Sequence, residues 1–89
     1  MKVEILMCTY NGEDFIEQQI QSILDQTHTE LKLIIVDDIS KDETVKIIKK
    51  MMANDERIEF HQNKKNLGYF NNFLSGLDFV TADYLFFVD

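Results

Sequence analysis

Short apolar runs and amphipathic stretches alternate along the whole chain. Runs of branched and aromatic residues predict strands, whereas apolar residues spaced three and four positions apart predict helices. The predicted strands are VEILMC at 3–8, LKLIIV at 31–36, IEFH at 58–61 and YLFFV at 84–88. The predicted helices cover residues 13–26, 40–54 and 69–79. This order, β-α-β-α-β-α-β, predicts an α/β fold with a Rossmann-like parallel sheet and helices on both of its faces.

Turn and cap residues mark the boundaries between these elements. Gly12 lies in the turn after the first strand and is able to take a positive φ. Ser40 and Glu43 have capping-box spacing, which predicts that the second helix begins at Ser40. The large aromatic residues of the last third of the chain are predicted to lie in the core. They are Phe70, Phe73, Phe79, Phe86 and Phe87.

Polar residues follow each predicted strand at the point where the strand ends. Because the carboxyl ends of parallel strands share one edge of a sheet, and ligands bind at that edge, these residues are expected to form one polar rim. They are Thr9-Tyr10-Asn11, Asp37-Asp38, Gln62-Asn63 and Asp89. Aspartates also serve as turn residues and helix caps. The adjacent acids Asp37 and Asp38, together with the aromatic ring of Tyr10, favour a binding site.

Composition limits the classes of function. The chain has 89 residues, 45% of them hydrophobic, which suits one compact domain over residues 1–89. A formal charge of −7 and a pI near 4.6 argue against a nucleic-acid partner. Its single cysteine excludes an internal disulfide, and no apolar run approaches the roughly 20 residues of a membrane span, so a cytoplasmic location is expected. A strand-like run that ends one residue before Asp89 leads us to expect a longer parent protein.

The rim lacks several familiar signatures of chemistry. Neither GxxxxGK[ST] nor GxGxxG occurs, since TYNG follows the first strand. Cys8, His28 and His61 do not have zinc-ligand spacing, and no GxSxG elbow is present. Cys8 by itself is predicted to be a small buried hydrophobe. What remains is a site of acids, amides and one tyrosine, suited to hydrogen-bond a base or ribose, or to hold a cation that neutralises a diphosphate.

Four segments, MCTYNG, LIIVDDIS-KDET, NKKNLG and ADYLFFVD, occur in this order along the chain. Together they resemble the N-terminal half of a family 2 glycosyltransferase. The resemblance implies a GT-A fold that binds a nucleotide-diphosphate sugar, UDP-linked in our interpretation. It implies inverting, metal-dependent transfer of that sugar to a saccharide, lipid-linked or protein acceptor, with a possible peripheral contact at the cytoplasmic membrane face.

The resemblance also implies roles for individual residues of the rim. The segment Cys8-Thr9-Tyr10, with Asn11 next to it, corresponds to the part that contacts the base. Asp38 corresponds to the acid that contacts uracil, and Asp37 is structural or supporting. Asn66 and Gly68 correspond to a loop near the nucleotide. Asp89 corresponds to the first acid of a DxD-type motif, whose later acid binds Mg²⁺ or Mn²⁺.

Two features limit this correspondence. Ile39 stands where the family commonly has a small or polar residue, so the turn after Asp38 is expected to differ. The catalytic base is expected beyond residue 89, so this chain alone is expected to hold only part of the donor site and to be inactive.

Three other classes of protein are alternatives to a glycosyltransferase. The first is a non-catalytic α/β domain whose rim residues serve only as caps and turns. The second is a phosphoacceptor signalling domain, which requires acids after the first strand and an aspartate after the third, where this chain has Gln62 and Asn63. The third is a sugar nucleotidyltransferase, which requires a glycine-rich loop where this chain has only Gly12.

Overall fold

A computed structural model of the chain describes residues 2–25, 30–80 and 84–88. The element order is the predicted β-α-β-α-β-α-β. The strands are β1 (Lys2–Thr9), β2 (Glu30–Asp37), β3 (Ile58–Gln62) and β4 (Tyr84–Val88). The helices are α1 (Ile16–Asp25), α2 (Thr44–Asn54) and α3 (Tyr69–Leu77).

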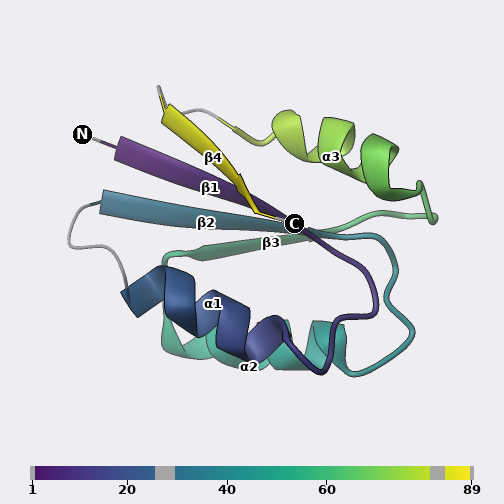
Figure 1. Cartoon of the computed structure of the whole chain (residues 1–89), viewed down its shortest axis with the longest axis horizontal. Helices are drawn as coiled ribbons and strands as arrows, with labels where there is room; N and C mark the ends of the chain where they lie inside the picture. The colour runs from purple at the N-terminus through teal and green to yellow at the C-terminus, as the bar shows by residue number, and fades with distance from the viewer. Residues whose placement is uncertain (1, 26–29, 81–83, 89) are drawn as a thin grey trace.

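The four strands form one parallel sheet in the order β3-β2-β1-β4. Helices α1 and α2 lie side by side on one face, and α3 lies on the other (Figure 1). The predicted fold class is therefore confirmed. The chain steps from β1 outward to β3 and then returns to the far side of β1 to form β4, so the strand order reverses beside β1. In doubly wound sheets, ligands bind in the crevice at that reversal, beyond the carboxyl ends of the strands.

Each face of the sheet has its own apolar core, because successive residues of a strand point to opposite sides. The larger core lies under α1 and α2. Its members are Met7, Ile16, Ile20, Leu24, Leu31, Leu33, Ile35, Ile48 and Ile58. The smaller core, Leu6, Ile34 and Val36, packs against α3 and the residues just after it. Gly76 allows α3 to approach closely, since a Cβ at this position would lie 2.8 Å from Leu6 Cδ1.

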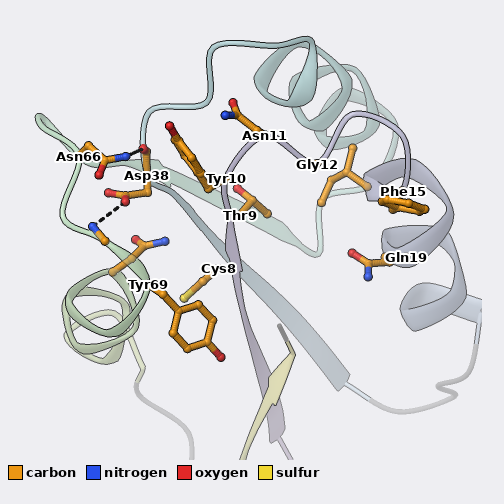
Figure 2. A pocket seen from close by; sticks show the side chains of 13 residues that line it. Cys8, Thr9, Tyr10, Asn11, Gly12, Phe15, Gln19, Asp38, Asn66 and Tyr69 are labelled. Carbon is orange, nitrogen blue, oxygen red and sulfur yellow. Dashed lines mark hydrogen bonds between the residues drawn. The ribbon is translucent and has the colours of Figure 1, made fainter.

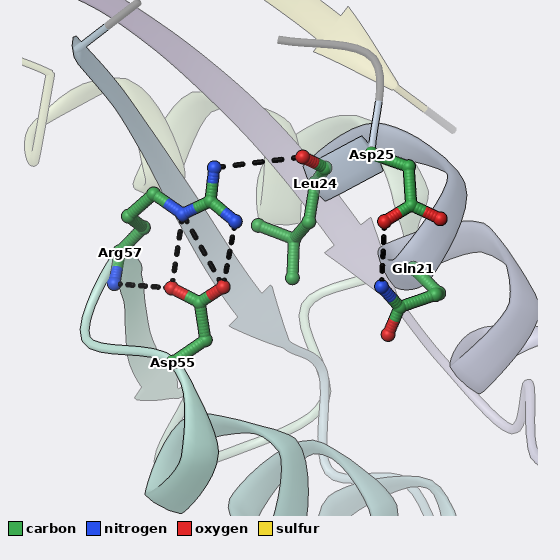
Figure 3. A network of polar contacts seen from close by, with 5 residues as sticks. All are labelled: Gln21, Leu24, Asp25, Asp55 and Arg57. Atoms are coloured by element: carbon green, nitrogen blue, oxygen red, sulfur yellow. Dashed lines mark hydrogen bonds and ion pairs between the residues drawn. The ribbon is translucent and has the colours of Figure 1, made fainter. Parts of the chain in front are cut away.

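Two polar clusters brace the sheet and its connections. The Arg57 guanidinium forms a two-pronged ion pair with Asp55, with Nη2 2.7 Å from Oδ2, and also donates to the Leu24 carbonyl at 3.5 Å (Figure 3). It thereby ties the end of α1 to the turn between α2 and β3, and its hydrogen bond holds the pKa of Asp55 below its ordinary value. On the α3 side of the sheet, Glu59 pairs with Lys32 and with His61, each at 2.6 Å.

Two local predictions were wrong. Helix α2 begins at Thr44 and not at Ser40, because the Ser40 backbone N–H donates to the Asp37 carboxylate at 2.8 Å and the residue stays in the preceding loop. In the turn after β1 the positive φ belongs to Asn11, at 51°, although Gly12 is free to take one. Phe70 is 66% exposed and not part of the core.

The other aromatic predictions divide by position. Phe73 and Phe79 pack against the smaller core, as predicted. The ring of Phe79 also stacks on His61, with centroids 3.6 Å apart. The side chains of Phe86 and Phe87 lie outside the part of the chain that the structure describes.

Candidate functional site

A pocket of about 570 Å³ opens at the carboxyl end of β1, between the start of α1 and the start of α3 (Figure 2). This is the crevice where the strand order reverses. A volume of this size is within the range of small-molecule and cofactor sites. The residues that line it come from the end of β1 and the loop after it, from α1, from the loop after β2, and from α3 with the loop before it. They are Cys8, Thr9, Tyr10, Asn11, Gly12, Phe15, Ile16, Gln19, Asp38, Asn66, Gly68, Tyr69 and Asn72.

Most of the nucleotide-binding residues predicted from the sequence meet in this pocket. Those that line it are Cys8, Thr9, Tyr10, Asn11, Asp38, Asn66 and Gly68. Asp37 does not line it, and Asp89 lies outside the described residues.

Asp37 is a buried connector and does not face the pocket. It has no exposed surface, and it lies on the same side of β2 as the core residues Leu33 and Ile35. Its carboxylate accepts hydrogen bonds from Thr9 Oγ1 at 2.7 Å and from Gln62 Nε2 at 3.2 Å, in addition to the bond from Ser40. Asp37 therefore joins three strand ends and the turn after its own strand, in line with the supporting role expected of it.

Asp38 faces the opposite side and holds the loop that precedes α3. Its carboxylate is 3% exposed and accepts from the backbone N–H groups of Leu67 at 2.7 Å and Gly68 at 2.9 Å. Asn63 Nδ2 donates to it at 3.0 Å, and Asn66 Nδ2 donates to the Asp38 backbone carbonyl at 3.0 Å. Two of these contacts are drawn in Figure 2. A negative group beside the first residues of α3 also suits the helix dipole.

The loops after β1 and β2 are hydrogen-bonded to each other. The Asn11 backbone N–H donates to Ser40 Oγ at 2.9 Å, and the Lys41 backbone N–H donates back to Asn11 Oδ1 at 2.8 Å. The Gly12 N–H donates to Thr44 Oγ1 at 2.8 Å. Asn11 thus contributes much of its hydrogen-bonding capacity to the structure of the rim.

Asp42 belongs to the same set of contacts between the two loops. Partial burial of Asp42 works to raise its pKa, but hydrogen bonds from Thr44 and Glu13 hold that pKa below its ordinary value. The carboxylate is therefore kept ionised by the donors around it, and it joins the start of α2 to the loop before α1.

Aromatic rings stand at the mouth of the pocket. Tyr10 is 51% exposed, Tyr69 59% and Phe15 65% (Figure 2). Exposed rings around a polar cleft are suited to stack on a flat heterocycle. Cys8 lies buried beneath them, as predicted.

Sequence reasoning missed four pocket residues that matter for its shape: Phe15, Gln19, Tyr69 and Asn72. The first three stand at the starts of the two helices that border the crevice, which the β-α-β order alone could have indicated. Asn72 is 2% exposed, donates to the Val36 carbonyl at 3.2 Å and accepts from Asn63 Nδ2 at 2.7 Å. An asparagine on the inner face of an otherwise apolar helix was the available signal.

The described residues do not form a divalent metal site. In residues 2–25, 30–80 and 84–88 no three His, Cys, Asp or Glu side chains come together in a way that could hold an ion. Asp37 and Asp38 point to opposite sides of the sheet, and protein donors already occupy both carboxylates.

Within the same described ranges, no helix has both the length and the apolar character needed to cross a bilayer.

Comparison with known sequences agrees with the geometry of the pocket. The family model "Glycosyl transferase family 2" matches residues 4–89. An uncharacterized glycosyltransferase of Haemophilus influenzae is 35% identical over 82 residues, which cover 92% of this chain and 25% of that protein. TarP of Staphylococcus aureus, a poly(ribitol-phosphate) beta-N-acetylglucosaminyltransferase, is 39% identical over 99% of this chain and 28% of its own length. The chain therefore spans about a quarter of the length of these relatives.

A solved structure extends the comparison to three dimensions. Residues 1–349 of S. aureus TarS, in complex with UDP-GlcNAc, match this chain with a TM-score of 0.89 and 28% identity, over 100% of this chain and 26% of that solved fragment. The sheet order, the pocket at its reversal and these matches lead to one conclusion: the chain belongs to glycosyl transferase family 2, with the GT-A fold of that family.

Proposed function

We propose that the whole protein transfers a sugar from a nucleotide-diphosphate donor, UDP-linked, to an acceptor hydroxyl. The observation that carries the proposal is the pocket at the strand reversal, which gathers seven of the predicted nucleotide-binding residues. The likeness to a structure that holds UDP-GlcNAc supports the choice of donor. We further propose that residues 1–89 contribute part of a single GT-A domain and hold only a part of the donor site.

The pocket suggests how the nucleotide is bound. We infer that the exposed ring of Tyr10 stacks on the base, beside the backbone of Thr9, whose hydroxyl is already bonded to Asp37. The loop that contains Asn66 and Gly68 forms the opposite wall, held there by Asp38. Stacking gives affinity with little choice between bases, so base preference must come from polar groups of these walls.

The remaining parts of the reaction are proposed from the family resemblance. They are inversion at the anomeric carbon, a catalytic base outside this chain, and a Mg²⁺ or Mn²⁺ ion that would neutralise the diphosphate. Asp89 is the candidate ligand within this sequence. A saccharide, lipid-linked or protein acceptor and a cytoplasmic location, with a peripheral contact at the membrane face, complete the proposal.

Calorimetric titration of the full-length protein with UDP in the presence of Mn²⁺ tests the donor site. Tyr10→Ala should weaken UDP binding by about 1–3 kcal/mol, the usual contribution of one stacked base. Phe70→Ala is the matched control, because Phe70 is equally an exposed ring but does not line the pocket, and it should leave the affinity unchanged. Failure of the wild-type protein to bind UDP would refute the proposed donor.

A further inference from the structure

Asp38 has a task at this site that the family resemblance does not assign. Its carboxylate already accepts three hydrogen bonds, from the backbone N–H groups of Leu67 and Gly68 and from Asn63 Nδ2. An ionised carboxylate offers about four acceptor positions, so most of its capacity is used before any nucleotide arrives. We propose that Asp38 is a positioning residue, which fixes the segment 66–69 as one wall of the nucleotide pocket. This inference rests on the proposed function.

The segment needs an external anchor because its own residues do not supply one. Gly68 is the N-terminal flanking residue of α3, has φ +83° and carries no side chain that could cap the helix. The Asp38 carboxylate, thirty positions away, accepts from the Gly68 N–H and so fixes this residue directly before the first turn of α3. The next residue, Tyr69, begins α3 and carries its ring to the mouth of the pocket.

The other end of the loop is fixed independently. Asn63 donates both to Asp38 and to Asn72, and Asn72 in turn donates to the Val36 carbonyl of β2. Ser75 Oγ donates to Asn63 Oδ1 at 3.3 Å. The start of the loop is thus attached to the sheet and to α3. At the 66–68 end, Asn71 Nδ2 donates to the Leu67 carbonyl at 3.2 Å from within α3, and Asp38 supplies the bonds that attach this end to the sheet.

An asparagine at position 38 would separate the shape of this side chain from its capacity to accept hydrogen bonds. It keeps nearly the same shape, but one of its two oxygens becomes an NH₂ group. Leu67 and Gly68 donate to different oxygens of the Asp38 carboxylate, so the NH₂ group would face one of these two N–H groups donor to donor. With Asp38 almost fully buried, water is poorly placed to replace the lost acceptor.

The first experiment measures amide hydrogen exchange at Leu67 and Gly68 by NMR, in the full-length protein without nucleotide. Asp38→Asn should speed exchange by tenfold or more at whichever of the two amides faces the NH₂ group, while amides of the buried strand β2 keep their wild-type rates. Asp25→Asn is the matched control: this exposed aspartate accepts from the Gln21 side chain at 2.8 Å and does not line the pocket, so its substitution should change neither amide. Unchanged exchange in Asp38→Asn would overturn the proposal.

The second experiment asks whether Asp38 acts on the nucleotide through the wall. Affinity for UDP is measured for wild type, Asp38→Asn, Tyr69→Leu and the double variant. Each single variant should bind UDP several-fold more weakly, and the double variant should lose little beyond the larger single loss, because both changes remove the same wall. Additive losses would mean that Asp38 contributes independently, by direct contact with the base, and would overturn the positioning role.

A further variant keeps the proposal testable if Asp38→Asn does not fold. Asn66→Ala removes the tie to the Asp38 carbonyl and leaves the carboxylate intact. It should speed exchange at Leu67 and Gly68 to a smaller extent, and no change there would also count against the proposal. Lack of UDP binding by the wild-type protein argues against the proposed function, whereas the exchange rates test Asp38 without any nucleotide.

Discussion

Ile39 occupies a backbone conformation that β-branched residues rarely adopt. Its φ is +62°, in the left-handed region, where the Cβ approaches the following carbonyl oxygen. Both neighbours are fixed by hydrogen bonds: the Asp38 N–H donates to the Thr9 carbonyl at 2.9 Å, and the Ser40 N–H donates to Asp37. The position is thus over-determined by its surroundings, and the strain is retained.

The cleanest test compares Ile39→Gly with Ile39→Ala. Both variants remove the packing of the isoleucine side chain, so that loss largely cancels in the comparison. Alanine keeps a Cβ and therefore the left-handed strain of roughly 1–2 kcal/mol, which glycine avoids. Glycine loses about 0.5–1 kcal/mol more in backbone entropy on folding. Ile39→Gly should therefore be more stable than Ile39→Ala by about 0.5–1 kcal/mol.

Urea denaturation followed by circular dichroism measures this difference. Lys49→Ala and Lys49→Gly form the control pair, since Lys49 is an exposed residue inside α2 with ordinary helical geometry. There the order must be the reverse, with glycine less stable by about 1 kcal/mol. An Ile39→Ala variant as stable as Ile39→Gly, or more so, would refute the assignment of strain to this turn.

Three further predictions concern the stability of the fold. Asp37→Ala should lower the free energy of unfolding by about 2–4 kcal/mol, because several buried donors lose their acceptor; urea denaturation measures it, and a loss below about 1 kcal/mol would contradict the connector role. Arg57 lowers the pKa of Asp55, so the ion pair stabilises the fold at pH values above the ordinary pKa of about 3.9. This stabilisation is lost as the pH falls through the lower pKa of the folded state. Arg57→Leu should therefore flatten the acid side of the profile of unfolding free energy against pH, and an unchanged profile would contradict this. Gly76→Val should destabilise the fold by about 1–3 kcal/mol, measured by thermal denaturation, because its branched side chain would collide with Leu6; wild-type stability would contradict the close approach of α3.

The element order and the two-sided sheet could be predicted because they depend on local patterns. The spacing of apolar residues within each segment predicts whether it is a strand or a helix and which side of it is buried. The rules for parallel crossover connections then determine the architecture. The start of α2 could not be predicted in this way. Ser40 has the residue type and spacing of a helix cap, but Asp37 and Asn11 hold it in the loop, and one of these lies 29 positions away.

The site shows the same division between local and distant causes. Alternation along β2 could have indicated that the two adjacent acids point to opposite sides of the sheet, although the sequence analysis placed both on one rim. What occupies each carboxylate depended on distant segments, since the donors to Asp38 lie 25 to 30 positions further along the chain. The position of Tyr69 at the pocket also depends on distant residues, because Asp38 holds the loop that directly precedes it.

The reciprocal hydrogen bonds between the loops after β1 and β2 have a consequence for protein engineering. Asn11 and Ser40 each use a side chain to satisfy backbone of the other loop, so neither loop retains its shape without the partner's sequence. A graft that imports only the Tyr10–Gly12 segment from a relative, in order to alter the choice of donor, would leave the recipient loop without its counterpart. The two loops should therefore be exchanged together, as one structural unit.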